Sequence, residues 1–231
     1  MHSPLPYVRR YLVQAIPTIA LMIGLSTTAQ AGASGETIEP EAEPVTMRLT
    51  DFTNPEHNAR WYPLLDNVMG GRSLGTLKIA DGVLAFTGSI NTNGGGFASI
   101  RLPVAAGTFT GATHVSLRLR VPDTPQLRDR GPFRMILIDD LHTLPRDHPD
   151  RRSRRITHRI DLPLDPTLAG QWQTVSVPLA GFTPSWRGRS MPNEAAINPD
   201  RTVELGLILN DATDGPFHLD VDAIDLHMPG P

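Results

Sequence analysis

The sequence predicts an all-β protein, a β-sandwich or jelly roll, and three observations support this fold class. Short apolar runs recur along the chain, several with the alternation that is typical of half-buried strands. Glycine (20) and proline (22) are plentiful and fall between these runs, where turns are expected. No segment of the expected domain has the apolar spacing of a long amphipathic helix.

The first 31 residues are predicted to be a signal peptide. Arg9 and Arg10 make the start positive, residues 13–25 are apolar, and Ala-Gln-Ala at 29–31 has the small residues of a cleavage site. The apolar segment is too short to favour a membrane-spanning helix. We therefore expect a periplasmic or secreted protein with no membrane span after the signal is removed.

Residues 32–46 are predicted to be a flexible acidic linker, and residues 47–228 to form the jelly-roll domain. The linker holds four glutamates among prolines and small residues. Removing the two arginines of the signal peptide takes the formal net charge from −3 to −5, which argues against nucleic acid as a partner. Cysteine is absent, which excludes disulfides, thiolate metal sites and cysteine nucleophiles.

Ten segments are expected to be strands. In chain order they are residues 47–52, 74–80, 83–90, 95–102, 113–121, 133–138, 154–162, 171–177, 203–209 and 217–226. The alternation is clearest in 113–121, where Val115, Leu117 and Leu119 lie on one face and arginines on the other. Asp81-Gly82 between the second and third segments is a strong two-residue hairpin signal.

The connections between these strands differ in length and character. Residues 54–63 are expected to be irregular, with Trp61 and Tyr62 anchored in the core, and Trp172 is also expected in the core. Two connections are long. They are residues 141–153 and residues 182–200. The arginine run Arg146–Arg159 is expected to be a solvated loop, with anion binding as the alternative.

Two glycine-rich stretches each lead into a strand. The first is Asp-Asn-Val-Met-Gly-Gly-Arg-Ser at 66–73, and the second runs from Asn91 to Arg101. Asn210-Asp211 directly follows a strand, so an antiparallel arrangement would place all three at one rim of the sandwich. We expect a site for a ligand or partner at this rim. The candidate binding residues of the whole chain are Asp66, Asn67, Arg72, Asn93, Arg101, Trp186, Arg187, Asn210 and Asp211.

The candidates in the glycine-rich stretches also have structural interpretations. Asp66 and Asn67 can bind the hydroxyl groups of a ligand, or they can cap the backbone of their own turn, which is the commoner use of such residues. Arg72 and Arg101 can grip a carboxylate or phosphate through the guanidinium fork. They can equally form structural ion pairs, with Asp66 or Asp211 as the expected partners.

The remaining candidates leave similar alternatives open. Trp186 with Arg187 can stack on a sugar ring or a partner surface, or can anchor its loop in the core. Asn210-Asp211 can face the glycine-rich stretches or simply begin a turn. No fingerprint of a nucleophile, phosphate loop or dinucleotide site occurs, and the histidines lack the spacing of a zinc site. We therefore expect no catalytic residues, no metal and no cofactor.

Several segments resemble, in order and spacing, those of the complex I intermediate-associated protein 30 family. They are residues 66–73, 82–88, 93–101, 172–175, 186–189, 205–211 and 215–221. The resemblance spans roughly residues 47–226 and implies a galactose-binding-like jelly roll in a bacterial, exported member. The chain departs from the family at 122–132, where a longer charged loop replaces a short glycine-aspartate-glycine turn.

The resemblance also implies a function, because eukaryotic members of the family assist the assembly of respiratory complex I. It favours a non-catalytic, exported binding module that acts as a protein-binding assembly factor or a chaperone-like factor. The fold and Trp186 make a carbohydrate-binding module the alternative, and an enzyme is the least expected. The expected partner is thus a protein or a glycan.

Overall fold

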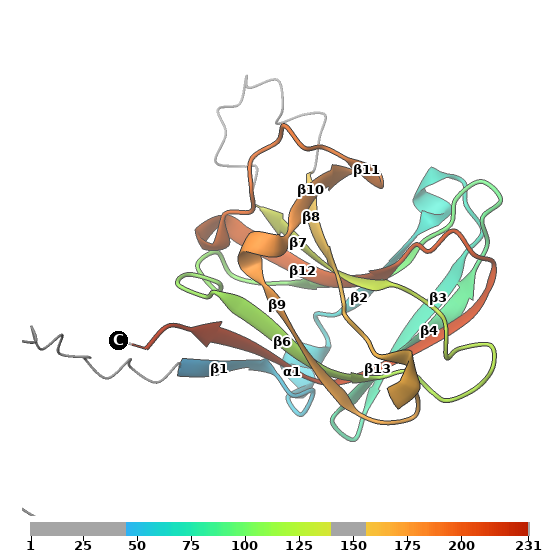
Figure 1. The fold of residues 1–231 in the computed structure, drawn as a ribbon, viewed down its shortest axis with the longest axis horizontal. Helices are drawn as coiled ribbons and strands as arrows, with labels where there is room; N and C mark the ends of the chain where they lie inside the picture. The colour runs from blue at the N-terminus through green and yellow to red at the C-terminus, as the bar shows by residue number, and fades with distance from the viewer. Residues whose placement is uncertain (1–44, 140–155, 231) are drawn as a thin grey trace, which may run out of the picture. The chain divides into compact units, whose positions relative to one another are not determined.

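A computed structural model describes residues 45–139 and 156–230, and it confirms the all-β fold class (Figure 1). The predicted signal peptide, the predicted linker up to residue 44, and residues 146–155 of the predicted arginine loop lie outside the described residues. Residues 157–159 of that predicted loop belong to a strand instead. The first strand begins at Val45, so the last two residues of the predicted linker belong to the domain instead.

The described strands form two sheets in which all neighbouring strands are antiparallel (Figure 1). Sheet one has the order β3 (Leu74–Ala80), β4 (Val83–Ile90), β13 (Gly215–Met228), β6 (His114–Arg120) and β9 (Gln173–Pro178), and β1 (Val45–Thr50) also pairs with β13. Sheet two has the order β11 (Arg189–Ser190), β10 (Thr183–Trp186), β8 (Thr157–Asp161), β7 (Phe133–Asp139), β12 (Thr202–Leu209), β5 (Ala98–Pro103) and β2 (Tyr62–Leu65).

The helical elements are short. One α-helix, α1 (Pro55–Asn58), has its N-terminus capped by the side chain of Asn54. The 3-10 turns are η1 (Asp66–Met69), η3 (Pro166–Leu168), η4 (Leu179–Gly181) and η5 (Pro199–Arg201). None is long enough to shape the core, so the fold depends on the strands.

The 14-residue strand β13 organises sheet one. Its first half pairs with β4, from Gly215 opposite Ile90 to Val221 opposite Leu84. Its second half pairs with β1 as far as Met228 opposite Val45, and β6 runs along its other edge. A register shift after Val221 marks a β-bulge, which lets one long strand serve successive partners.

Alternating side chains of both sheets meet in one core. Val115, Leu117 and Leu119 of β6 are fully buried, as their alternation predicts. Three phenylalanines join the two sheets, since Phe217 lies edge-on to Phe86 in sheet one and to Phe133 in sheet two, with ring centroids 4.8 and 6.4 Å away. Burying each such ring stabilises the fold by about 1.5–3 kcal/mol, so these contacts hold the sheets together.

Local signals differed in how well they predicted structure. Asp81 and Gly82 have φ of 52° and 74°, the left-handed backbone of a tight hairpin turn, and this confirms the predicted β3–β4 hairpin. Trp61 is buried, as expected. Three strands were missed. β2 begins within the connection 54–63 that was expected to be irregular, and β10 and β11 lie within the long connection 182–200.

Two aromatic residues lie elsewhere than predicted. Tyr62 is 36% exposed on the outer face of sheet two, where its hydroxyl lies 2.8 Å from a carboxylate oxygen of Glu204. Trp172 is not in the core but half-buried just before β9, and the guanidinium groups of Arg118 and Arg120 lie over its ring at 5.0 and 4.6 Å. Such cation–π contacts explain why an indole at a strand end can stay outside the core.

Candidate functional site

Three loops leave the sandwich at the same end. In sheet two, the end of β2, the start of β5 and the end of β12 lie side by side, because Leu65 pairs with Ala98 and Ala98 with Leu209. In sheet one, the end of β4 lies opposite the start of β13. The first glycine loop (66–73), the second glycine loop (91–97) and the β12–β13 turn (210–214) therefore share one rim.

Asp66 joins the two glycine loops. Its side chain is fully buried and accepts hydrogen bonds from the Ser73 amide at 2.9 Å and the Ser73 hydroxyl at 2.6 Å, both within the first loop. It also accepts from the amides of Gly96 at 2.6 Å and Phe97 at 3.3 Å in the second loop. One carboxylate thus holds both loops in place.

Glycine is required around this carboxylate because there is no room for a side chain. A Cβ atom on Gly71 would lie 2.2 Å from the carboxyl carbon of Asp66, and one on Gly95 would lie 2.3 Å from its Oδ2. Both distances are far below van der Waals contact. Close packing around Asp66 therefore explains one glycine in each cluster, Gly71 and Gly95.

The surroundings keep Asp66 ionised. Burial acts to raise the pKa of its carboxyl, but the hydrogen bonds from Ser73, Gly96 and Phe97 together outweigh burial, and the pKa lies below its usual value. A negative charge in this position attracts the amide hydrogens of both loops. The backbone of the two glycine loops is thereby held in place.

The β12–β13 turn is tied to the second glycine loop and to an arginine. The amide of Thr92 donates to Asp214 at 2.7 Å. Arg130, from the β6–β7 connection, donates to the Thr213 carbonyl at 2.9 Å and forms a buried ion pair with Asp211 at 3.4 Å. The sequence did not single out Arg130, because nothing local distinguishes it from the other arginine of its charged loop.

The two arginines of the glycine-rich stretches do not pair as expected. Arg72 is exposed at the rim and forms no hydrogen bond or ion pair with another described residue. Arg101 lies three residues into β5, on the outer face of sheet two and only 6% exposed. Its partner is Glu204 of β12 at 3.5 Å, so the predicted pairing with Asp66 or Asp211 is wrong.

The other candidate residues divide between the two ends of the sandwich. Asn67 and Asn93 are exposed on the glycine loops, and Asn210 accepts a hydrogen bond from the Arg134 guanidinium beside them. Trp186 lies at the far end, because the neighbouring Ser185 pairs with the start of β8 rather than its end. There the guanidinium of Arg187 lies 5.0 Å from the Trp186 ring, so this pair does not join the glycine loops.

Large apolar side chains are exposed on the first glycine loop and where it enters β3. Val68 is 65% exposed, Met69 51% and Leu74 68%. These three residues, which we call the apolar rim patch, stand on a backbone that Asp66 holds rigid. Apolar exposure on a fixed loop is unusual for a purely structural turn.

Two further observations concern metal binding and membrane spans. Among residues 45–139 and 156–230, no three His, Cys, Asp or Glu side chains gather closely enough to hold a metal ion. Within the same residues, no helix has the length and apolar character needed to cross a membrane.

The fold and the loops can now be compared with known proteins. Among solved structures, the fold is similar to the family 11 carbohydrate-binding module of a cellulosomal cellulase of Clostridium thermocellum, with 12% identity, a TM-score of 0.53, and coverage of 80% of this chain and 95% of that one. A family 11 module of the same organism in complex with a β-1,3-1,4-mixed-linked tetrasaccharide gives 13% identity, a TM-score of 0.53, and coverage of 80% and 96%. At these identities the likeness shows the fold alone.

No curated protein matches the chain. The model of the family described as complex I intermediate-associated protein 30 matches residues 50–221, which include most of the sandwich and all three loops of the rim. Since this match covers well over half of the sequence, the chain belongs to the complex I intermediate-associated protein 30 family.

Proposed function

We propose that the protein is an exported, non-catalytic binding module that holds another protein through its glycine-loop rim. The apolar rim patch is the observation that carries this proposal, because Val68, Met69 and Leu74 are each large, apolar and exposed, and all three lie in the first glycine loop or at the start of β3. Exposed apolar side chains with polar neighbours are typical of protein interaction sites. The predicted signal peptide supports export.

The preorganised backbone supports the same function. Binding through a mobile loop would cost conformational entropy, whereas the four hydrogen bonds to Asp66 fix this loop in advance. Exposed Asn67 and Arg72 flank the patch and can form the polar edge of an interface. The family's description as an intermediate-associated protein is also in keeping with a protein partner.

Site-specific photo-crosslinking in cells tests the proposal. A photoreactive amino acid at Met69 should give a discrete protein adduct of the exported chain, and Val68→Ser in the same chain should weaken that adduct at an unchanged melting temperature. Leu168, an exposed leucine on η3 outside the three rim loops, is the matched control position. Equal adducts at positions 69 and 168, or none at position 69, would contradict the proposal.

Carbohydrate binding is the second candidate, and the outer face of sheet two favours it. Tyr62 exposes its ring there, next to Arg101, which pairs with Glu204. The likeness to family 11 carbohydrate-binding modules adds an association at the level of the fold. Electrophoresis in gels containing mixed-linkage β-glucan decides the matter. Retardation that Tyr62→Ala abolishes would support this candidate, and unaltered mobility would favour the protein partner.

A further inference from the structure

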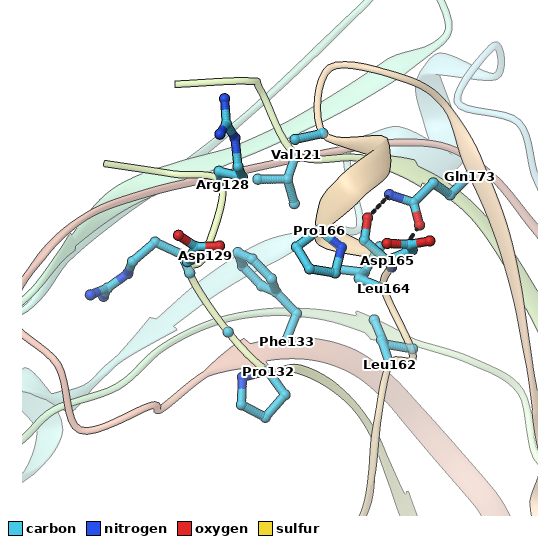
Figure 2. Close-up of a pocket in the computed structure, with 13 residues that line it drawn as sticks. Val121, Arg128, Asp129, Pro132, Phe133, Leu162, Leu164, Asp165, Pro166 and Gln173 are labelled. Atoms are coloured by element: carbon cyan, nitrogen blue, oxygen red, sulfur yellow. Dashed lines mark hydrogen bonds between the residues drawn. The ribbon is translucent and has the colours of Figure 1, made fainter. Parts of the chain in front are cut away.

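We propose that a pocket between the two sheets binds a small organic cation with an apolar body. The pocket has a volume of about 240 Å³ and lies where the β6–β7 and β8–β9 connections face each other (Figure 2). In this measure a single water needs only about 10–15 Å³, so the space suits a small organic molecule. The site is separate from the apolar rim patch and independent of the proposed function.

The inner wall of the pocket is apolar and belongs to the core. Phe133 lies at the end of the β6–β7 connection and Leu162 at the start of the β8–β9 connection, and both are buried. Val121, Leu164 and Pro166 complete the wall (Figure 2). An apolar group placed there would leave water for a surface of aliphatic and aromatic carbon, which is the usual driving force for occupying such a pocket.

The walls are held in place by hydrogen bonds that do not involve a ligand. The side-chain amide of Gln173 accepts from the Asp165 amide and donates to the Asp165 carbonyl, both at 2.9 Å (Figure 2). The amide of Gly170 donates to the Val121 carbonyl at 2.8 Å, which joins the two connections directly. The pocket is therefore preformed, and a ligand would not have to order it.

The charged residues around the pocket leave an excess of negative charge. Both arginines in its lining already have carboxylate partners outside the lining, since Arg128 bonds to Asp123 at 2.8 Å and Arg130 pairs with Asp211. The two acids in the lining, Asp129 and Asp165, form no ion pair with any residue in the described part of the chain. The lining and its ion-pair partners thus comprise two arginines and four aspartates.

The two acids differ in position. Asp165 caps η3 by accepting hydrogen bonds from the amide and hydroxyl of Thr167 at 2.8 and 2.7 Å. Both bonds lower the pKa of its carboxyl, the hydroxyl bond more than the amide bond. Asp129 has no such partner, and Figure 2 shows its carboxylate beside the ring of Phe133. A cation attached to an apolar body on the Phe133 side of the pocket would therefore meet Asp129 first.

Three probes of matched size test this inference: 2-phenylethylamine, 2-phenylethanol and phenylacetate. Titration of the mature chain, followed by amide resonances in NMR spectra, should show the amine shifting residues 121–133 and 162–173. Because Asp129 is exposed, its charge should strengthen amine binding only about fivefold over the alcohol. Phenylacetate should bind more weakly than the alcohol.

Two variants separate the cavity from the charge. Ala169→Leu places a larger side chain in the pocket and should abolish binding of all three probes, whereas Asp129→Asn should keep binding but remove the preference for the amine. Asp81→Asn, at the exposed β3–β4 turn, is the matched control and should behave as the unaltered chain. Absence of any shift, equal affinity for the three probes, or an unchanged preference in Asp129→Asn would each overturn the proposal.

Discussion

The carboxylate of Asp66 accepts hydrogen bonds from donors up to 31 residues away along the chain. A buried charge is costly unless its lone pairs are satisfied, and here four donors from two loops supply that compensation. The same charge fixes the backbone on which the apolar rim patch stands. Asp66 thus determines the shape of both loops.

Replacing Asp66 with Asn should destabilise the protein. The amide group keeps the size of the side chain but loses the charge, and its NH2 would face donors rather than acceptors. We expect the free energy of unfolding to fall by about 2–3 kcal/mol, measured by urea denaturation at neutral pH. Asn67→Ala, at the exposed neighbouring residue, is the control and should change it little. Equal midpoints for Asp66→Asn and the unaltered chain would contradict the assigned role.

The contribution of Asp66 should also depend on pH. Its folded pKa lies below the unfolded value of 3.8, so the stability that it contributes is present above that value and is lost as pH falls through the folded pKa. The exposed carboxyls of Asp51, Asp165 and Asp214 shift in the same direction, so the difference between the unaltered chain and Asp66→Asn is the informative quantity. That difference should be constant between about pH 7 and pH 5 and smaller at about pH 3. A difference that grows on acidification would show that Asp66 is protonated in the folded protein.

At the residue scale the sequence could predict which positions matter better than what they contact. Asp66 in a glycine-rich turn was open to a capping role, because Asp and Asn commonly bond nearby backbone. The partner of Arg101 could not be predicted, since it depends on the register between β5 and β12. In that register Arg101 lies opposite Gly206, and Glu204 lies two residues before Gly206 on the same strand. Only the paired strands bring Arg101 and Glu204 together.

Among elements, the first glycine loop is shaped by two adjacent glycines that serve different purposes. Gly70 has φ of 89° with no atom near its missing Cβ, so only its backbone conformation requires glycine. Gly71 has no positive φ but lies against Asp66, so its missing side chain is what matters. The pair therefore distinguishes backbone strain from steric conflict within one loop.

Alanine at these two positions should have unequal effects. Gly70→Ala should cost about 1–2 kcal/mol, the strain of a left-handed residue, and should leave the Asp66 hydrogen bonds intact. Gly71→Ala should cost more, because its Cβ would displace the carboxylate. Amide hydrogen exchange reads out the difference directly. The amides of Gly96 and Phe97 should lose protection only in Gly71→Ala, and equal protection in both variants would contradict the steric explanation.

Strands were predicted where alternation was regular and missed where proline interrupts a short run. The segments in β3, β4 and β6 show clear apolar periodicity or a strong turn, and the structure confirms them. The missed strands β2 and β10 have four residues each and contain Pro63 and Pro184. Proline is tolerated there because β2 forms one edge of sheet two, and β10 is followed only by the two-residue β11.

In the described domain as a whole, non-local pairing dominates. Sheet one is completed only when β13, the last strand, pairs with β1, β4 and β6 from the first half of the domain. Closing such long loops costs entropy before any pairing compensates for it, which is characteristic of β-proteins that fold slowly. The fold class follows from local patterns, but the strand order does not, because many arrangements of the same strands would bury the same apolar faces.

The pairing of β1 with the end of β13 brings the first and last strands of the domain together, with Val45 directly opposite Met228. The domain can therefore be circularly permuted, and a host protein could carry it as an insertion in a surface loop. Joining position 228 to position 45 through a hairpin loop of about four residues, with new termini between Asp81 and Gly82, should give a folded protein with a cooperative thermal transition. Opening the chain instead after Val221, in the middle of β13, should prevent folding, and a permutant that tolerates that cut would show that the long strand is dispensable.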